Sequence, residues 1–146
     1  MYMPRMISQL AVATFMVLLT VTIHGFGLLL LTRVLRLEWK EEREANQSPL
    51  SAGGIMLTFG IVLGLFLLHG IEIWAYAAVF LQLGALPDLE TAVYFSTVTY
   101  STLGYDDDAL ATSWQLVAAI EGINGVLLMG WSTAFFISMI GRLRRG

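Results

Sequence analysis

The sequence predicts an all-α membrane protein with three transmembrane helices and one short helix that enters and leaves the membrane on the same side. Hydrophobic residues make up 57% of the 146 positions, and the mean hydropathy is +0.73, far outside the range of soluble domains. Three apolar stretches are long enough for the roughly 20 helical residues that cross a hydrocarbon core. The polar segment between the second and third stretches contains no basic residue.

The first apolar stretch, residues 7–32, is expected to be a retained transmembrane helix. A cleaved signal peptide is the alternative, but the stretch is too long for a signal core and has no small-x-small cleavage site before Thr32. The sequence that follows, RVLRLEWKEERE, mixes opposite charges at one-turn spacing, which predicts that the helix continues into water until a break near Pro49. We therefore divide the chain into an N-terminal helix with a charged cytoplasmic linker, residues 1–48, and a second unit, residues 49–146.

Two further spanning helices are predicted at residues 55–83 and 114–141. Both are rich in glycine, and small residues let a neighbouring helix approach closely. The glycines of the first of these helices are Gly53, Gly54, Gly60, Gly64 and Gly70. In the last helix, Gly122 and Gly125 could also allow a bend, and Thr112 or Ser113 is expected to cap its start.

The basic residues predict which side of the membrane each end faces. Basic residues near the ends of spans mark the cytoplasmic side, and here they gather in the first loop and at the C-terminus: Arg33, Arg36, Lys40, Arg43, Arg142, Arg144 and Arg145. The first loop and the C-terminus are therefore expected inside, and the N-terminus and residues 84–113 outside, although Arg5 weakly opposes this. We expect a multi-pass protein of the plasma membrane or inner membrane.

The segment between the last two spans, GALPDLETAVYFSTVTYSTLGYDDD, predicts a helix too short to cross the membrane. Pro87 suits a first helical position. Asp88 and Glu90 place carboxylate groups in the first turn, where the helix dipole stabilises negative charge. The helix is therefore expected at residues 87–100. The chain after it is expected to be extended around Gly104. Such irregular backbone is tolerated at membrane depth only where it is buried in protein or lines a watery path.

The motif STLGYDD resembles the potassium-channel filter signature Thr-Val-Gly-Tyr-Gly-Asp, with Leu103 in place of Val and Asp106 in place of the second Gly. The preceding TAVYFSTVTYS is similar to the pore helix of that family, and WQLVAAIEGINGVLLMG is similar to its pore-lining inner helix. The resemblance covers roughly residues 50–145, the outer helix, pore loop and inner helix of two-pore and small bacterial channels. It implies that residues 49–146 are a pore domain, with the filter at 101–106 and the inner helix at 113–141.

The resemblance implies a homotetrameric potassium channel. In such a pore, backbone carbonyls from four chains replace the water shell of the ion, and a heterologous ring of four subunits closes. The carbonyls of Thr102, Leu103, Gly104 and Tyr105 are the candidate ligands of K⁺, with Asp106 at the outer mouth. Potassium is the permeant ion, and no cofactor, enzymatic activity or nucleic-acid binding is expected.

Three further residues are implied to support the filter. Tyr94 and Phe95 correspond to the family's aromatic pair and are expected to pack behind the filter strand. Asp107 corresponds to its post-filter aspartate and is expected to anchor the strand, with the Tyr94 hydroxyl as a suitable partner. All three assignments rest on the resemblance.

The departure at Asp106 leaves two other functions open. Four such carboxylates would concentrate cations, attract divalent ions and weaken discrimination against sodium. A weakly selective or divalent-sensitive cation channel is therefore one alternative. The other is a non-conducting membrane subunit that keeps the pore fold and scaffolds a partner.

Ionisable residues inside the predicted spans are candidates for function. For Glu72 we expect a structural role, held by the pore helix or by His69, because too few metal ligands lie near it in the sequence. His24 is expected to form a hydrogen bond between helices, and a haem site that joins it to His69 has no other support.

Two polar residues lie near the start of the last span. Glu121 is expected to point behind the filter toward pore-helix hydroxyl groups such as those of Thr97 or Thr99. Asn124 either faces the ion pathway or packs between helices, and the sequence favours neither alternative.

Overall fold

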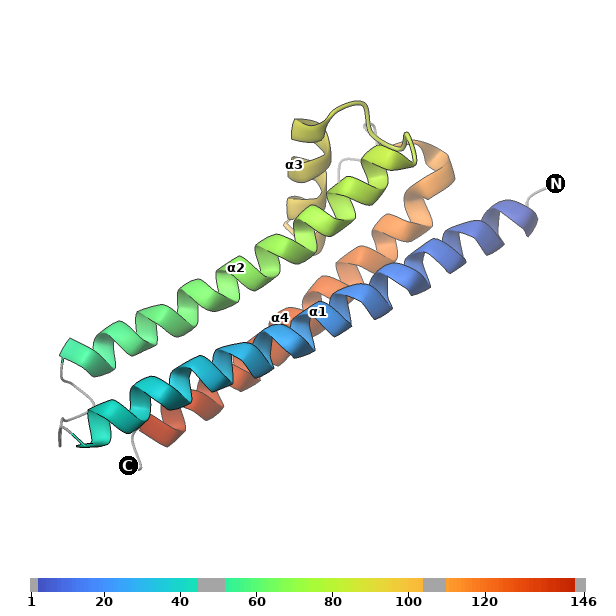
Figure 1. Ribbon diagram of the computed structural model, residues 1–146. Coiled ribbons are helices and arrows are strands. Elements are labelled where there is room, and N and C mark those ends of the chain that lie inside the picture. Colours follow the sequence, from blue (N-terminus) through green and yellow to red (C-terminus); the bar gives the residue numbers. More distant parts are fainter. Residues whose placement is uncertain (1–2, 45–51, 104–109, 144–146) are drawn as a thin grey trace.

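A computed structural model describes residues 3–44, 52–103 and 110–143 (Figure 1). The described residues form four α-helices and one 3₁₀ turn and contain no strand. The elements are α1 (Met3–Glu44), α2 (Ala52–Gln82), α3 (Leu89–Tyr100), the 3₁₀ turn η1 (Thr112–Trp114) and α4 (Gln115–Leu143). Three segments are long and apolar enough to cross a membrane: Met6–Leu35, Ala52–Gln82 and Thr112–Gly141. The predicted all-α membrane fold is confirmed.

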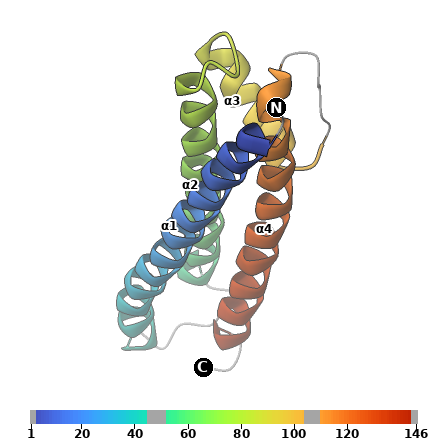
Figure 2. The same ribbon diagram turned by 90° about the vertical axis from the view of Figure 1, so that its right-hand side faces the viewer.

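The three long helices run side by side, and the short helix α3 lies at one end of the bundle against α2 and α4 (Figures 1 and 2). The N-terminus lies at this same end. The C-terminus and the end of α1 lie at the opposite end (Figure 1). The chain therefore enters and leaves α3 at one end of the bundle, as a re-entrant segment requires.

The helix α1 extends well beyond its apolar part. It runs for 42 residues, so the charged sequence after Leu35 is helical to Glu44, as predicted. Lys, Arg and Glu are good helix formers, and opposite charges one turn apart add support. The predicted break near Pro49 lies outside the described residues.

The start of α3 differs from the prediction. Asp88 is the N-cap residue, with extended backbone at φ −154° and ψ 168°. Its carboxylate accepts hydrogen bonds of 2.9 Å from the backbone N–H and from the hydroxyl group of Thr91. These bonds hold the pKa of Asp88 below its usual value. The helix thus begins at Leu89, and the predicted first position for Pro87 was wrong because the aspartate cap sets the boundary.

The start of α4 also differs from the prediction. Thr112 and Ser113 lie inside η1, so neither is the cap that we expected. Ala111 precedes the turn, and its backbone N–H donates to the Ala85 carbonyl at 3.1 Å. This backbone bond to the α2–α3 connection holds the start of α4 together with Gln9 of α1, whose Oε1 accepts a hydrogen bond from the Leu116 N–H at 3.1 Å.

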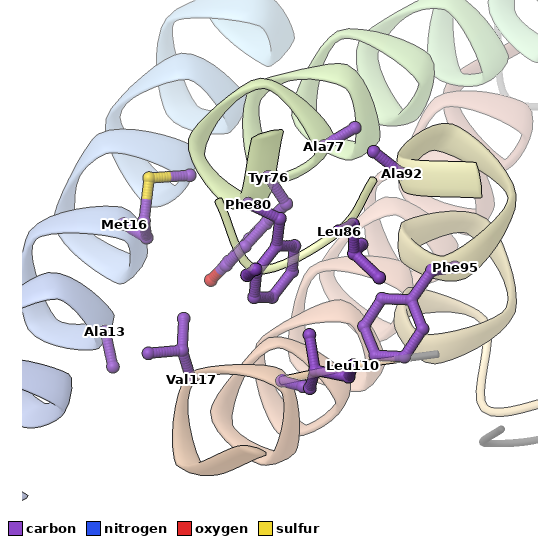
Figure 3. Packing of buried hydrophobic residues seen from close by; sticks show 12 residues of the cluster. Ala13, Met16, Tyr76, Ala77, Phe80, Leu86, Ala92, Phe95, Leu110 and Val117 are labelled. Carbon is purple, nitrogen blue, oxygen red and sulfur yellow. The ribbon is translucent and has the colours of Figure 1, made fainter. Parts of the chain in front are cut away.

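The core at the α3 end joins all four helices. Tyr76 and Phe80 of α2 project toward Val117 of α4, Phe95 of α3 and Met16 of α1 (Figure 3). At the other end of the bundle, a second cluster unites the three long helices through Leu28, Leu35, Leu57, Ile61, Leu65, Leu68 and Met139. The first helix is therefore part of the packed core and not an appendage.

Two glycines allow α1 and α2 to interlock. A Cβ atom on Gly27 would overlap the side chain of Leu68, and one on Gly64 would lie 2.9 Å from Cδ1 of Leu31. Each leucine thus fills the space that a glycine of the other helix leaves. Gly60 and Gly70, expected at close contacts, have no such neighbour within 4 Å.

Candidate functional site

The helix α3 ends in a tight turn at the start of the predicted filter. The backbone N–H of Thr102 donates to the Thr99 carbonyl at 3.1 Å, and the N–H of Leu103 donates to the Val98 carbonyl at 3.0 Å. With Thr102 in the left-handed region at φ 58°, these bonds form a Schellman motif, a common helix terminus. The expected extended backbone is therefore wrong for residues 101–103.

Thr102 occupies the position that glycine usually takes in this motif. A β-branched residue at positive φ is an outlier and stores about 1–3 kcal/mol of backbone strain. Leu103 is 80% exposed, so its side chain is available to contacts outside the chain. The remaining residues assigned to the filter and its anchor lie outside the described residues: Gly104, Tyr105, Asp106 and Asp107.

The aromatic pair of α3 is divided between core and surface. Phe95 packs edge-on against Phe80, with ring centroids 5.6 Å apart. Tyr94 is 66% exposed and lines a surface hollow together with Trp74 and Asp88. Phe95 thus fixes α3 to α2, and Tyr94 presents its ring outward; packing of the pair behind the filter strand stays a prediction, because most of that strand lies outside the described residues.

Glu72 joins three helices at the end of α3. It is fully buried, and its Oε1 lies 2.8 Å from His24 Nδ1 of α1. The Tyr100 hydroxyl donates to its Oε2 at 2.5 Å, and His69 Nδ1 lies 3.2 Å from the same oxygen. Tyr100 is the last residue of α3, so this carboxylate ties the residue next to the predicted filter to α1 and α2.

Ser132 of α4 closes the network on its other side. Its Oγ lies 2.9 Å from His69 Nε2 and 3.4 Å from His24 Nε2. The two imidazole rings lie with centroids 5.3 Å apart, each between Glu72 and Ser132. This arrangement does not match a haem held between two histidines. It brings three possible metal-ligating side chains together, which the sequence spacing did not reveal.

Glu121 of α4 is fully buried beside Ser96 of α3. Neither of its carboxylate oxygens makes a well-formed hydrogen bond within the described structure, although Ser96 of α3 is its polar neighbour. The hydroxyl groups of Ser96 and Thr99 are likewise buried and unpartnered there. The hydroxyl group of Thr97, the other partner expected for Glu121, instead donates to the Val93 carbonyl of its own helix at 2.7 Å.

Asn124 packs between three helices. Its Nδ2 donates to Thr20 Oγ1 of α1 at 2.7 Å and to the Tyr76 hydroxyl of α2 at 3.2 Å. The side chain is 3% exposed. Of the two alternatives for Asn124, the geometry therefore supports packing.

Two glycines of α4 let the end of α3 approach its backbone. A Cβ atom on Gly125 would overlap the Tyr100 carbonyl, and one on Gly122 would lie 3.4 Å from the Thr99 carbonyl oxygen. These two glycines therefore allow the close approach of a neighbouring helix that was expected of glycines in this span, and the neighbour is the end of α3.

Glu72 was expected to be held by the short helix or by His69, and both Tyr100 of α3 and His69 contact it. The expected bond of His24 between helices is also present, but its partner, Glu72, was not identified from the sequence. A usable signal was present, since ionisable groups in apolar spans pair with one another or with polar groups. His24 lies midway along one span, and Glu72 lies within another.

These features define a membrane protein whose spanning helices carry a re-entrant segment between them. The sequence profile of a family described as "Ion channel" matches residues 55–142, more than half of the chain. The chain therefore belongs to this family of two-transmembrane ion channels of the K⁺-channel pore type. The match begins within α2 and ends in α4, so α1 lies outside it. Searches among curated proteins and among solved structures give no significant match.

Proposed function

We propose that this chain forms a homotetrameric potassium-selective channel with the filter Thr102-Leu103-Gly104-Tyr105-Asp106 on the four-fold axis. The observation that carries the proposal is the position of α3, which ends at Tyr100 directly before this motif and between two spanning helices. A dehydrated cation needs oxygens in place of its water shell, and inward-facing carbonyls can supply them. Passive conduction then requires no further chemistry from the protein.

The tetramer follows from how much of a pore one chain can build. A single chain contributes one filter segment and one short helix, which cannot surround an ion. Leu103, Tyr94 and the α4 residues Ile123 and Leu127 are each more than 60% exposed, so they are available to lipid or to neighbouring subunits. A ring of four identical contacts closes without free interfaces.

The orientation in the membrane is part of the proposal. The end of the bundle that holds α3 and the N-terminus faces outside, and the C-terminus faces the cytoplasm of a cell bounded by its plasma or inner membrane. Basic residues in the first loop and at the C-terminus support this assignment.

Recording from the purified protein in planar bilayers tests the proposal. Under opposing potassium and sodium gradients, the reversal potential is expected to follow potassium alone. Gly104→Ala is the control, expected to assemble as a tetramer of wild-type mass without conducting. Native mass spectrometry that finds only monomers or dimers would contradict the proposal, as would wild-type current from Gly104→Ala. A tetramer silent under every condition would favour the non-conducting scaffold.

Asp106 motivates a second candidate, a weakly selective or divalent-sensitive cation channel. The carboxylate stands where the related signature has glycine, and a ring of four would attract divalent cations. Asp106→Gly is expected to relieve external calcium block and to raise the ratio of potassium to sodium permeability. Identical block and permeability ratios in the two proteins would show that this carboxylate has no part in permeation.

A further inference from the structure

We propose that His24, His69 and Glu72 bind a divalent transition-metal ion of the Zn²⁺ type, which fastens α1 to the channel-forming helices. This inference concerns a site separate from the filter and does not depend on ion selectivity. Each of these residues offers one donor atom, and the three atoms lie within 4.8 Å of one another. His24 and Glu72 are fully buried, and the His69 side chain is 18% exposed.

The inner nitrogens of both histidines converge on the carboxylate. His24 Nδ1 lies 2.8 Å from Oε1 of Glu72, and His69 Nδ1 lies 3.2 Å from Oε2. Tetrahedral zinc with bonds of about 2.0–2.1 Å separates its ligand atoms by about 3.3–3.4 Å. The two nitrogen–oxygen distances lie within a few tenths of an ångström of this separation, and all three donor atoms lie within 4.8 Å of one another. The Tyr100 hydroxyl, 3.0 Å from His69 Nδ1, is the nearest candidate for a further ligand.

The outer nitrogens of both histidines converge on one hydroxyl group. His69 Nε2 and His24 Nε2 lie 2.9 and 3.4 Å from Ser132 Oγ. Histidines that bind metal almost always donate their other ring N–H to an acceptor, which fixes the tautomer and the ring orientation. A hydroxyl oxygen has two lone pairs, so Ser132 can accept from both rings.

The donor set also matches this class of ion. Two imidazole nitrogens and one carboxylate suit zinc and its first-row neighbours better than the hard cations magnesium and calcium. The Trp131 ring, with its centroid 5.2 Å from that of His24, packs beside the site. Because α1 supplies His24 and α2 supplies the other two ligands, a bound ion would hold α1 in place beside Tyr100.

Metal analysis of the full-length protein in detergent tests the site. After exposure to Zn²⁺ and removal of free metal, we expect about one zinc per chain by mass spectrometry of the elements. Glu72→Gln and His24→Gln should each lower the zinc content at least tenfold. Glu121→Gln, a change to another buried carboxyl group in the same bundle, should keep wild-type content. Co²⁺ in place of Zn²⁺ should give the visible ligand-field bands of a four-coordinate ion.

Ser132→Ala tests the metal site even if the ligand variants fail to fold. Ser132→Ala retains all three ligands and removes only their shared acceptor, so its zinc affinity should fall about 10- to 100-fold. Wild-type protein that holds no zinc above buffer level would overturn the proposal and leave a network joined by protons alone. Zinc retained in Glu72→Gln and His24→Gln would also overturn it. Metal content is independent of current, so either result leaves the channel proposal standing.

Discussion

Two carboxyl groups are fully buried beside the short helix α3, and they differ in their hydrogen-bond partners. Glu72 of α2 has three polar partners, from α1, from α2 itself and from the end of α3. Glu121 of α4 has no well-formed hydrogen bond within the described structure. Burial of a polar group is tolerated where partners replace water and is unfavourable where they do not. The comparison therefore separates a carboxylate that holds the fold from one that the fold must accommodate.

The difference between the two sites is supplied largely by α1. His24 is the partner of Glu72 that comes from outside the segment matched by the ion-channel family. Thr20, one turn earlier on α1, accepts the hydrogen bond from Asn124. The additional helix thus provides polar partners for groups on both α2 and α4. Among the described residues, Glu121 receives no such partner from α1, and its polar neighbour Ser96 of α3 also lacks a well-formed hydrogen bond.

The largest effect is expected from Glu72→Ala. Removing the carboxylate leaves His24, His69 and the Tyr100 hydroxyl without their common partner. The free energy of unfolding should fall by about 3–5 kcal/mol, as when one member of a buried pair is removed. Equilibrium unfolding in mixed detergent micelles measures this change. Glu121→Ala is the matched control, since it deletes the same atoms, and equal losses in both variants would refute the distinction between the two sites.

The helices themselves could be predicted from the sequence, because the free energy of apolar spans in lipid depends on length and composition. Even the helical continuation of α1 to Glu44 followed from its charge pattern. The short helix and His69 were expected to hold Glu72, but its contact with His24 of α1 was not predicted. The sequence establishes that a buried carboxylate needs a partner, but the choice depends on how α1 packs, which the Gly27–Leu68 and Gly64–Leu31 contacts determine.

The conformation at the end of α3 was also beyond prediction. Local rules place positive φ at glycine, so the chain from Ser101 onward was expected to be extended around Gly104. The chain instead reverses at Thr102, where two backbone hydrogen bonds to Val98 and Thr99 satisfy carbonyls at the helix end. Which residue ends a helix depends on a balance of about 1–3 kcal/mol between strain and such bonds, too small a difference for sequence patterns to resolve.

The next effect concerns the contact that places α3 between the two carboxyl groups. In Gly125→Ala, the new methyl group would overlap the Tyr100 carbonyl and displace the residue that donates to Glu72. We expect a loss of about 1–3 kcal/mol in the free energy of unfolding, typical of overpacking, together with loss of current in bilayers. Gly130→Ala is the control, because no atom lies within 4 Å of its new methyl group. If the two variants behaved alike, the close contact would have no energetic importance.

A smaller effect of opposite sign is expected from Glu121→Met. The thioether side chain has a similar length and removes a buried polar group that lacks partners. The free energy of unfolding should rise by about 1 kcal/mol, because the desolvation of the carboxyl group is no longer required. The same unfolding measurement applies. A loss comparable to that of Glu72→Ala would mean that Glu121 gains a partner in the assembled protein, and the contrast between the two sites would then hold only within a single chain.

The smallest effect belongs to a third carboxyl group at the exposed start of α3. The hydrogen bonds from Thr91 lower the pKa of Asp88, so the folded protein binds this proton less readily than the unfolded chain. Its contribution to stability is therefore complete above the usual aspartate pKa of about 3.9 and is lost as the pH falls through the lower folded value.

Asp88→Asn keeps a capping side chain that does not titrate. We therefore expect the wild type and the variant to have the same melting temperature near neutral pH, and the wild type to melt at a lower temperature than the variant in acid. If the melting temperatures of the two proteins changed with pH in parallel, the charge would add nothing to the cap. Because water screens this exposed site, its partners stabilise the helix only slightly, whereas partners of the same kind determine whether the buried Glu72 can be tolerated at all.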